Sequence, residues 1–203
     1  WEQNHSIAHY PTHIGHQLYF PPWAEFAILH TVLLSGGDRF ANFIQWFAMM
    51  GSILGVTLIA KQLGGDRRSQ FLAGLFCATI PMGILQSTST QNDFVVAFWL
   101  VSFVSLGIRF KDAPSWALAI PFGASLGLAI LTKGTPYLYT LPFLLWVSVT
   151  LLRKAPRRTL PYLAAAAALV VALNAGHAAR NIAAIGHPLS NDRKFLSNDT
   201  FGP

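Results

Sequence analysis

Residues 86–104 read QSTSTQND followed by FVVAFWLVSFV, a polar run of eight residues that passes directly into a mostly apolar segment. A second apolar segment precedes the polar run, so the pattern predicts a turn between two apolar helices. Asp93 stands where the later helix would begin. A carboxylate there is stabilised by the helix dipole and the free N–H groups, by about 0.3–1 kcal/mol. The position of Asp93 therefore has a purely structural explanation, and any function depends on what else faces the same way.

The composition of the whole chain indicates an integral membrane protein. Of its 203 residues, 53% are hydrophobic and only 11% are charged, whereas soluble domains carry about 25% charged residues. The net charge of +6 does not indicate nucleic acid binding, because the basic residues form short clusters between apolar spans. Cys77 is the single cysteine of the chain and can form no intrachain disulfide.

The apolar segments predict an all-α polytopic transmembrane helix bundle with about six spans. We place the spans near 43–60, 69–86, 94–109, 115–132, 136–152 and 160–179. Residues 23–35 are too short to cross a bilayer, which takes about 20 residues, and are predicted to form a juxtamembrane amphipathic helix. The domain organisation that follows is an outer loop over 1–22, the juxtamembrane helix over 23–35, the bundle over 36–180 and a truncated outer tail over 181–203. We interpret the chain as a fragment of a longer membrane protein.

The charges between the spans predict the orientation in the membrane. Three junctions, at 61–68, 109–114 and 153–159, hold nine of the 14 basic residues and two acids, a net charge of +7. The remaining residues carry five basic residues and six acids, a net charge of −1. The positive-inside rule places the three basic junctions in the cytoplasm. The residues around Glu25, Asp93, Lys133 and Arg180 would then share the non-cytoplasmic side.

Four histidines lie in the N-terminal stretch, at His5, His9, His13 and His16. Their spacing imitates one face of a helix, which would suit a metal ion. Pro11 and Gly15 make a continuous helix unfavourable there, so a solvated loop is the preferred interpretation. No metal site is assigned, and a need for a divalent cation stays open.

Two cationic positions are candidate sites for a phosphate. Lys133 interrupts an apolar region at a membrane boundary, where it either reaches for the headgroups, neutralises a phosphate, or pairs with Asp93. Arg180 and Asn181 follow a long apolar span, which suits headgroup anchoring or phosphate recognition. Gly186-His187-Pro188 predicts a sharp turn beyond them.

The order of these motifs resembles that of the C-type membrane glycosyltransferases. The motifs are the Pro21-Pro22 pair, the GGDRFAN turn at 36–42, an aspartate opening a span, Thr132-Lys133-Gly134, and Arg180-Asn181 before a Gly-x-Pro. The resemblance is to the branch with protein O-mannosyltransferases and lipid A aminoarabinose transferases, and it covers nearly the whole chain. Relatives often carry Lys or His before the double proline, where this chain has Phe20.

The resemblance implies transfer of a sugar from a polyprenyl-phosphate donor to a protein or glycolipid acceptor, with inversion. It also implies that the best-known catalytic aspartate of the family lies upstream of Trp1. The candidate catalytic residues in this chain are Asp93, which would orient or support the base, and Glu25. A carboxylate base can activate the acceptor, and fixed cations stabilise a departing phosphate. The candidate substrate-binding residues are Lys133, Arg180, Asn181 and His16.

The expected location is the plasma membrane, a bacterial inner membrane, with the site on the non-cytoplasmic face. A transporter or lipid flippase is the alternative, in which Asp93 and Lys133 would form a gating ion pair. A purely structural membrane subunit is a third option. No internal repeat is visible, which disfavours the transporter.

Overall fold

The computed structural model describes residues 20–188, and every regular element in that part of the chain is helical. The elements are α2 (Trp23–Ser35), the 3-10 helix η1 (Asp38–Phe40), α3 (Phe43–Gln62), α4 (Arg67–Ala78), α5 (Pro81–Ser87), α6 (Asp93–Asp112), α7 (Trp116–Thr132), α8 (Pro136–Lys154) and α9 (Pro156–Ile185). The predicted all-α class is confirmed. The histidine loop, His16 included, and the tail beyond residue 188 lie outside the described residues.

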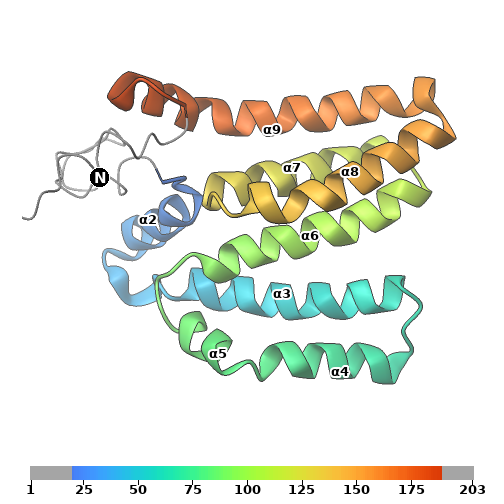
Figure 1. Cartoon of the computed structure of the whole chain (residues 1–203). Helices are drawn as coiled ribbons and strands as arrows, with labels where there is room; N and C mark the ends of the chain where they lie inside the picture. Colours follow the sequence, from blue (N-terminus) through green and yellow to red (C-terminus); the bar gives the residue numbers. More distant parts are fainter. Residues whose placement is uncertain (1–19, 189–203) are drawn as a thin grey trace, which may run out of the picture.

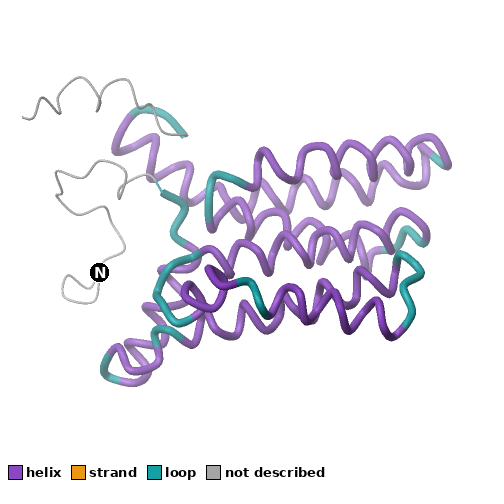
Figure 2. The backbone as a smooth tube through the Cα atoms, turned by 60° about the horizontal axis from the view of Figure 1, so that its bottom comes forward, coloured by secondary structure: helices purple, strands orange, loops and turns teal. Residues whose placement is uncertain are grey.

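The long helices lie side by side in a bundle whose turns gather at two ends (Figures 1 and 2). α6 packs against both α3 and α7, and α7 packs in turn against α9. One end carries residues 20–22, 36–42, 88–92, 133–135 and 186–188, and we call it the site end. The opposite end carries the three basic junctions. The arrangement agrees with the predicted alternation of the spans, and the side that faces the cytoplasm stays a prediction.

Three stretches are long and apolar enough to cross a membrane, by length and composition: Asp38–Gln62, Asp93–Asp112 and Pro156–Ala183. The pair of α4 and α5 supplies a fourth if it counts as one broken span. α7, with 17 residues, is a shorter apolar helix. The chain is thus an integral membrane protein. That α4–α5, α7 and α8 also cross the membrane, which would give six spans in total, stays a prediction.

The predicted span over 69–86 is not one straight helix, because the helix is interrupted between Ala78 and Pro81. α4 and α5 are bent by 65° at this point. Ile80 has φ −64° and ψ 113°, an extended conformation. A proline disfavours helical geometry in the residue before it, and Pro81 then begins the next helix, where no N–H is needed. Pro121 and Pro142 lie inside α7 and α8 without ending them.

The juxtamembrane helix is present with the predicted bounds, and the last helix is longer than expected. In α2, exposed positions include polar Glu25 and His30 as well as apolar Leu33 and Leu34. The polar and apolar residues are therefore not cleanly divided between two faces. α9 continues to Ile185, so the predicted tail from 181 begins as helix. It ends at Gly186, whose φ of 76° is the left-handed conformation typical of a helix C-cap.

The buried core of the bundle includes an aromatic cluster between α6, α7 and α8. Phe103 and Phe122 are almost fully buried, and their rings stack with centroids 4.6 Å apart. Phe143 meets Phe103 edge to face at 5.4 Å. On the other side of α7, Gly123 lets the backbone of α9 approach. A Cβ at Gly123 would lie only 2.7 Å from the Cα and the carbonyl oxygen of Ala166.

We expect Gly123→Ala to destabilise the protein by about 1–3 kcal/mol, because backbone atoms cannot move aside as a side chain can. Gly176→Ala is the matched control, since a Cβ there meets nothing within 4 Å and the helix propensity of alanine is higher. The measurement is the thermal unfolding midpoint of each full-length variant in detergent. A Gly123→Ala protein as stable as the wild type would contradict this packing.

Candidate functional site

An ion pair joins α6 to the end of α7 at the site end of the bundle. The Lys133 Nζ donates to Asp93 Oδ1 at 2.5 Å, between residues 40 positions apart in the chain. The two side chains are 37% and 35% exposed, so both remain partly accessible at the surface. Of the alternatives for Lys133, the pairing with Asp93 is confirmed as a contact. The roles of both residues in chemistry stay proposals.

The local sequence places Lys133 where a helix stops. Its backbone N–H still donates to Ala129 O at 3.1 Å, but its φ and ψ of −157° and 159° are extended. Gly134 and Thr135 then complete a short turn, and Pro136 begins α8 at a position that needs no N–H donor. The lysine is therefore held on a tight connection between two helices.

Gln45 of α3 fixes the start of α6, on which Asp93 lies. Its side chain is 1% exposed, and its Oε1 accepts from the backbone N–H groups of Phe94 at 3.1 Å and Val95 at 3.3 Å. The first N–H groups of a helix have no partner within the helix. Asn92, at the N-cap, makes no capping bond with its own side chain. A residue from a different helix thus supplies the cap.

The side chain of Asn92 is directed instead at Glu25, which brings the second candidate carboxylate to the same place. Asn92 Nδ2 donates to Glu25 Oε1 at 3.4 Å. The rings of Trp23 and Trp99 meet edge to face at 6.4 Å and hold α2 against α6. Glu25 lies at the surface of the protein. Neighbouring protein atoms nevertheless displace part of the water around its carboxyl group, and this desolvation raises its pKa. Hydrogen bonds from its own backbone and from Asn92 partly offset this rise in pKa.

Arg180 and Asn181 lie at the site end of α9, where His177 accompanies them. The Arg180 guanidinium lies 5.5 Å from the centre of the Phe26 ring, which ties α9 to α2. Its Nη2 is 3.5 Å from His177 Nδ1. Asn181 is 1% exposed, and its Nδ2 lies 3.2 Å from His177 Nε2 and donates to Pro188 O at 3.3 Å.

A recess of about 440 Å³ opens beside these residues, and we call it the site pocket. Tyr137, Asn174, His177 and Asn181 supply its polar side chains. It is completed by Phe20, Pro21, Ile130, Gly134, Ala178 and Pro188. Asn174 lies on the same helix face as His177 and Asn181, because positions three, four and seven apart share a face. No carboxylate lines the pocket among the described residues.

The structure thus brings the predicted residues together in two groups. Asp93 pairs with Lys133, and Glu25 joins them through Asn92. Arg180 and Asn181 form the second group on α9, and Gly134, next to Lys133, lines the pocket that Asn181 also lines. Within residues 20–188, no group of three or more His, Cys, Asp or Glu side chains is arranged to hold a metal ion.

Sequence reasoning missed Gln45, Asn174 and His177. The last two left a signal, since both are polar residues at helical spacing in an otherwise apolar segment. Gln45 left none, because its partners lie 49 and 50 residues further along the chain.

Gln45→Leu should remove the cap from α6 while keeping the volume similar. We expect a loss of about 1–3 kcal/mol in stability, the usual consequence of leaving buried donors without partners. Amide hydrogen exchange at Phe94 and Val95 should become faster. Gln91→Leu, at an exposed position in the same loop, is the control. Unchanged exchange at both amides in Gln45→Leu would show that this cap does not hold the helix start.

The comparisons with known proteins give one match. No curated protein and no solved structure matches the chain significantly. The sequence profile of the dolichyl-phosphate-mannose-protein mannosyltransferase family matches residues 20–175, which is more than half of the chain. The match begins just before α2, runs through the ion pair and ends within α9. The chain therefore belongs to the dolichyl-phosphate-mannose-protein mannosyltransferase family, a family of membrane glycosyltransferases.

Proposed function

We propose that this protein moves a sugar from a polyprenyl-phosphate donor to a protein or glycolipid acceptor on the non-cytoplasmic side, with inversion at the anomeric carbon. The observation that carries the proposal is the Asp93–Lys133 pair, inside the region matched by the family. The same pair would suit a transporter gate, and membership of the family favours the enzyme.

Lys133 is the proposed partner of the donor phosphate. The leaving group departs with its negative charge, so an ammonium already held in place lowers the barrier without having to reorganise. Its ion pair keeps the ammonium at the site end, while 37% exposure leaves room for a phosphate oxygen to approach. Arg180, on α9, is the proposed second cation of the site, and Asn181 would assist binding from the site pocket.

Glu25 and Asp93 divide the proposed acid–base work. A displacement by the acceptor hydroxyl or amine needs a base that takes its proton. Glu25 is on the helix that borders the site and is bonded to Asn92, the residue before Asp93. We propose that Glu25 helps to receive this proton. Asp93 would position Lys133 and support the base.

The direct test is label transfer from a radiolabelled polyprenyl-phosphate sugar pool in membranes that carry the full-length protein. Lys133→Ala and Asp93→Asn should each lower kcat by about 10²-fold or more, the usual effect of removing a group that stabilises transition-state charge. Stability should change by at most about 1 kcal/mol, because the pair is partly exposed.

Asp112→Asn is the matched control for this test. Asp112 accepts from Lys111 at the same 2.5 Å, but at the opposite end of the bundle. Its loss should leave transfer near the wild-type rate. If transfer persists in Lys133→Ala and Asp93→Asn, neither residue takes part in the site. If the wild type consumes no donor, the proposed glycosyltransferase activity is contradicted.

The raised pKa of Glu25 predicts how the activity falls on the acidic side of its pH profile. The base works only when ionised, so activity should fall as the pH drops through a value above the ordinary carboxyl pKa of 4.5. In Glu25→Gln this limb should disappear and the residual rate should be low. The measurement is kcat/KM against pH for both proteins. An unchanged acidic limb in Glu25→Gln would assign the titration to a different group.

A further inference from the structure

The turn between α8 and α9 carries a compact group of cations at the end of the bundle opposite the site end. Ala155 alone separates the two helices. Arg153, Lys154, Arg157 and Arg158 lie on either side of this turn, and all four are exposed. We call these four residues the basic hairpin. Four positive charges within six residues create a strong local field that attracts anions.

The acids at this end of the bundle do not neutralise the basic hairpin. Lys154 lies 3.7 Å from Asp112, a carboxylate that already accepts from Lys111 at 2.5 Å. Asp66, the other acid at this end, caps the start of α4. Within residues 20–188, no acid forms an ion pair with any of the three arginines of the hairpin. Most of its positive charge is therefore open to a partner from outside the chain.

Helix stability explains only half of the basic hairpin. Arg153 and Lys154 lie in the last turn of α8, where the helix dipole favours positive charge. Arg157 and Arg158 lie in the first turn of α9, where the dipole disfavours it. Among the described residues, no side chain caps α9, and its first turn holds no acid. The two arginines thus weaken the start of α9, and an external anion would offset this effect.

The surface next to the basic hairpin has the character of a membrane interface. Leu152 and Leu160 flank the four cations along the chain, and both are exposed. Trp116, at the start of α7, is 51% exposed, and its ring meets that of Tyr162 edge to face at 4.7 Å. Tryptophan and tyrosine gather where the apolar core of a membrane meets its headgroups. The cations therefore adjoin side chains that suit the headgroup region.

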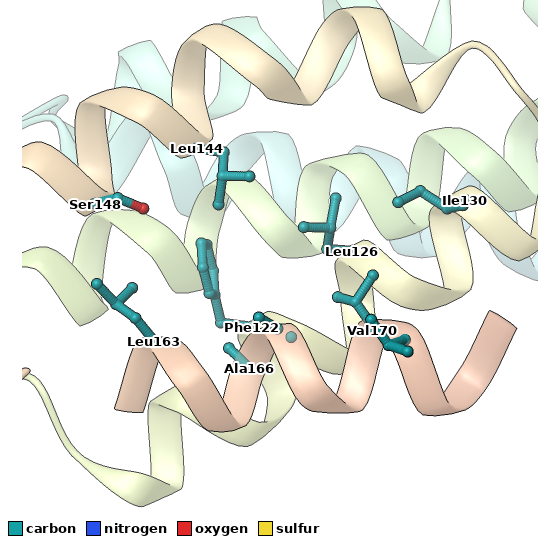
Figure 3. Close-up of a pocket in the computed structure, with 11 residues that line it drawn as sticks. Phe122, Leu126, Ile130, Leu144, Ser148, Leu163, Ala166 and Val170 are labelled. Carbon is teal, nitrogen blue, oxygen red and sulfur yellow. The ribbon is translucent and has the colours of Figure 1, made fainter. Parts of the chain in front are cut away.

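Apolar surface continues from the turn along both helices. α8 and α9 lie on two sides of a hollow of about 440 Å³, in which Ser148 and Leu163 are the lining residues nearest to the turn in sequence (Figure 3). Among the lining residues in the described part of the chain, Ser148 alone has a polar side chain. The stretch Pro156–Ala183, which is apolar and long enough to cross a membrane, begins at the turn itself. This position puts the basic hairpin at the level of lipid headgroups.

We propose that the basic hairpin binds the headgroups of anionic phospholipids in the surrounding leaflet. The partner must carry net negative charge and must reach a turn of one residue at the end of an apolar helix. A lipid in the bilayer meets both conditions, whereas an acidic protein would first have to pass the headgroups. Each lysine or arginine near an anionic membrane surface strengthens the attraction by about fivefold. This lipid site does not depend on sugar transfer.

The test is photocross-linking of the purified full-length protein in phosphatidylcholine nanodiscs. One preparation holds a small fraction of photoreactive phosphatidylglycerol, and the other holds the same fraction of photoreactive phosphatidylcholine. The yield of cross-links at the turn between α8 and α9 should be about fivefold higher, or more, with the anionic probe. A rise in salt concentration should lower this yield, because ions screen the attraction between exposed charges.

Arg157→Gln combined with Arg158→Gln should lower the yield with phosphatidylglycerol by about tenfold or more, because two cations are lost. Arg67→Gln combined with Arg68→Gln is the matched control. It removes the same charge from the first turn of α4, at the same end of the bundle. Its yield at the turn between α8 and α9 should stay within about twofold of the wild type. The thermal unfolding midpoints show whether both double variants are folded.

Three results would overturn the lipid site. One is an equal yield with the anionic and the neutral probe. A second is the same loss of yield in both double variants, which would indicate a response to net charge and not to the hairpin. The third is a wild-type yield that does not change with salt, a result that needs no variant. Because the purified protein carries no protein partner, equal yields would leave an acidic protein as the occupant.

Discussion

The arrangement of the site end depends on how the first N–H groups of α6 find partners. In an apolar surrounding, an unpaired backbone donor costs several kcal/mol, so a helix that begins at membrane depth must be capped from inside the protein. Gln45 of α3 does this for Phe94 and Val95. The side chains next to the cap are then free for other contacts, and Asn92 turns to Glu25 while Asp93 meets Lys133. One buried amide therefore caps the helix start beside which Asn92 and Asp93 make these contacts.

The charged residues are distributed unevenly between the two ends of the bundle. Asp93 begins α6, and Arg109 and Lys111 lie in its last turn, so both ends of this helix carry the charge that its dipole favours. The basic residues concentrate at the end opposite the site. Two cations at the site end have a partner: Lys133 pairs with Asp93, and Arg180 lies against Phe26 and His177. A phosphate that arrives there meets cations already held in place.

Much of the fold could be predicted from the sequence, because apolar runs and polar junctions are local features. The predicted bounds agree with α2, α6, α7 and α8 to within a few residues. The break at Pro81 was missed since α4 and α5 together have the length of one span, and only the conformation of Ile80 divides them. The ion pair was among the alternatives because a charge at a membrane boundary needs a partner. Gln45 could not be assigned, because its partners Phe94 and Val95 lie on a different helix that packs against α3 in space.

The short helix α2 has a consequence for how the site can change shape. It is attached to α6 through Trp23 and Asn92, and to α9 through Phe26, which lies against Arg180. A shift of α2 away from the bundle must therefore separate both attachments together. Glu25 would gain water and Arg180 would lose its aromatic neighbour in the same movement. A movement of α2 would therefore change the surroundings of Glu25 and Arg180 together, although no direct contact joins Glu25 to the guanidinium among the described interactions.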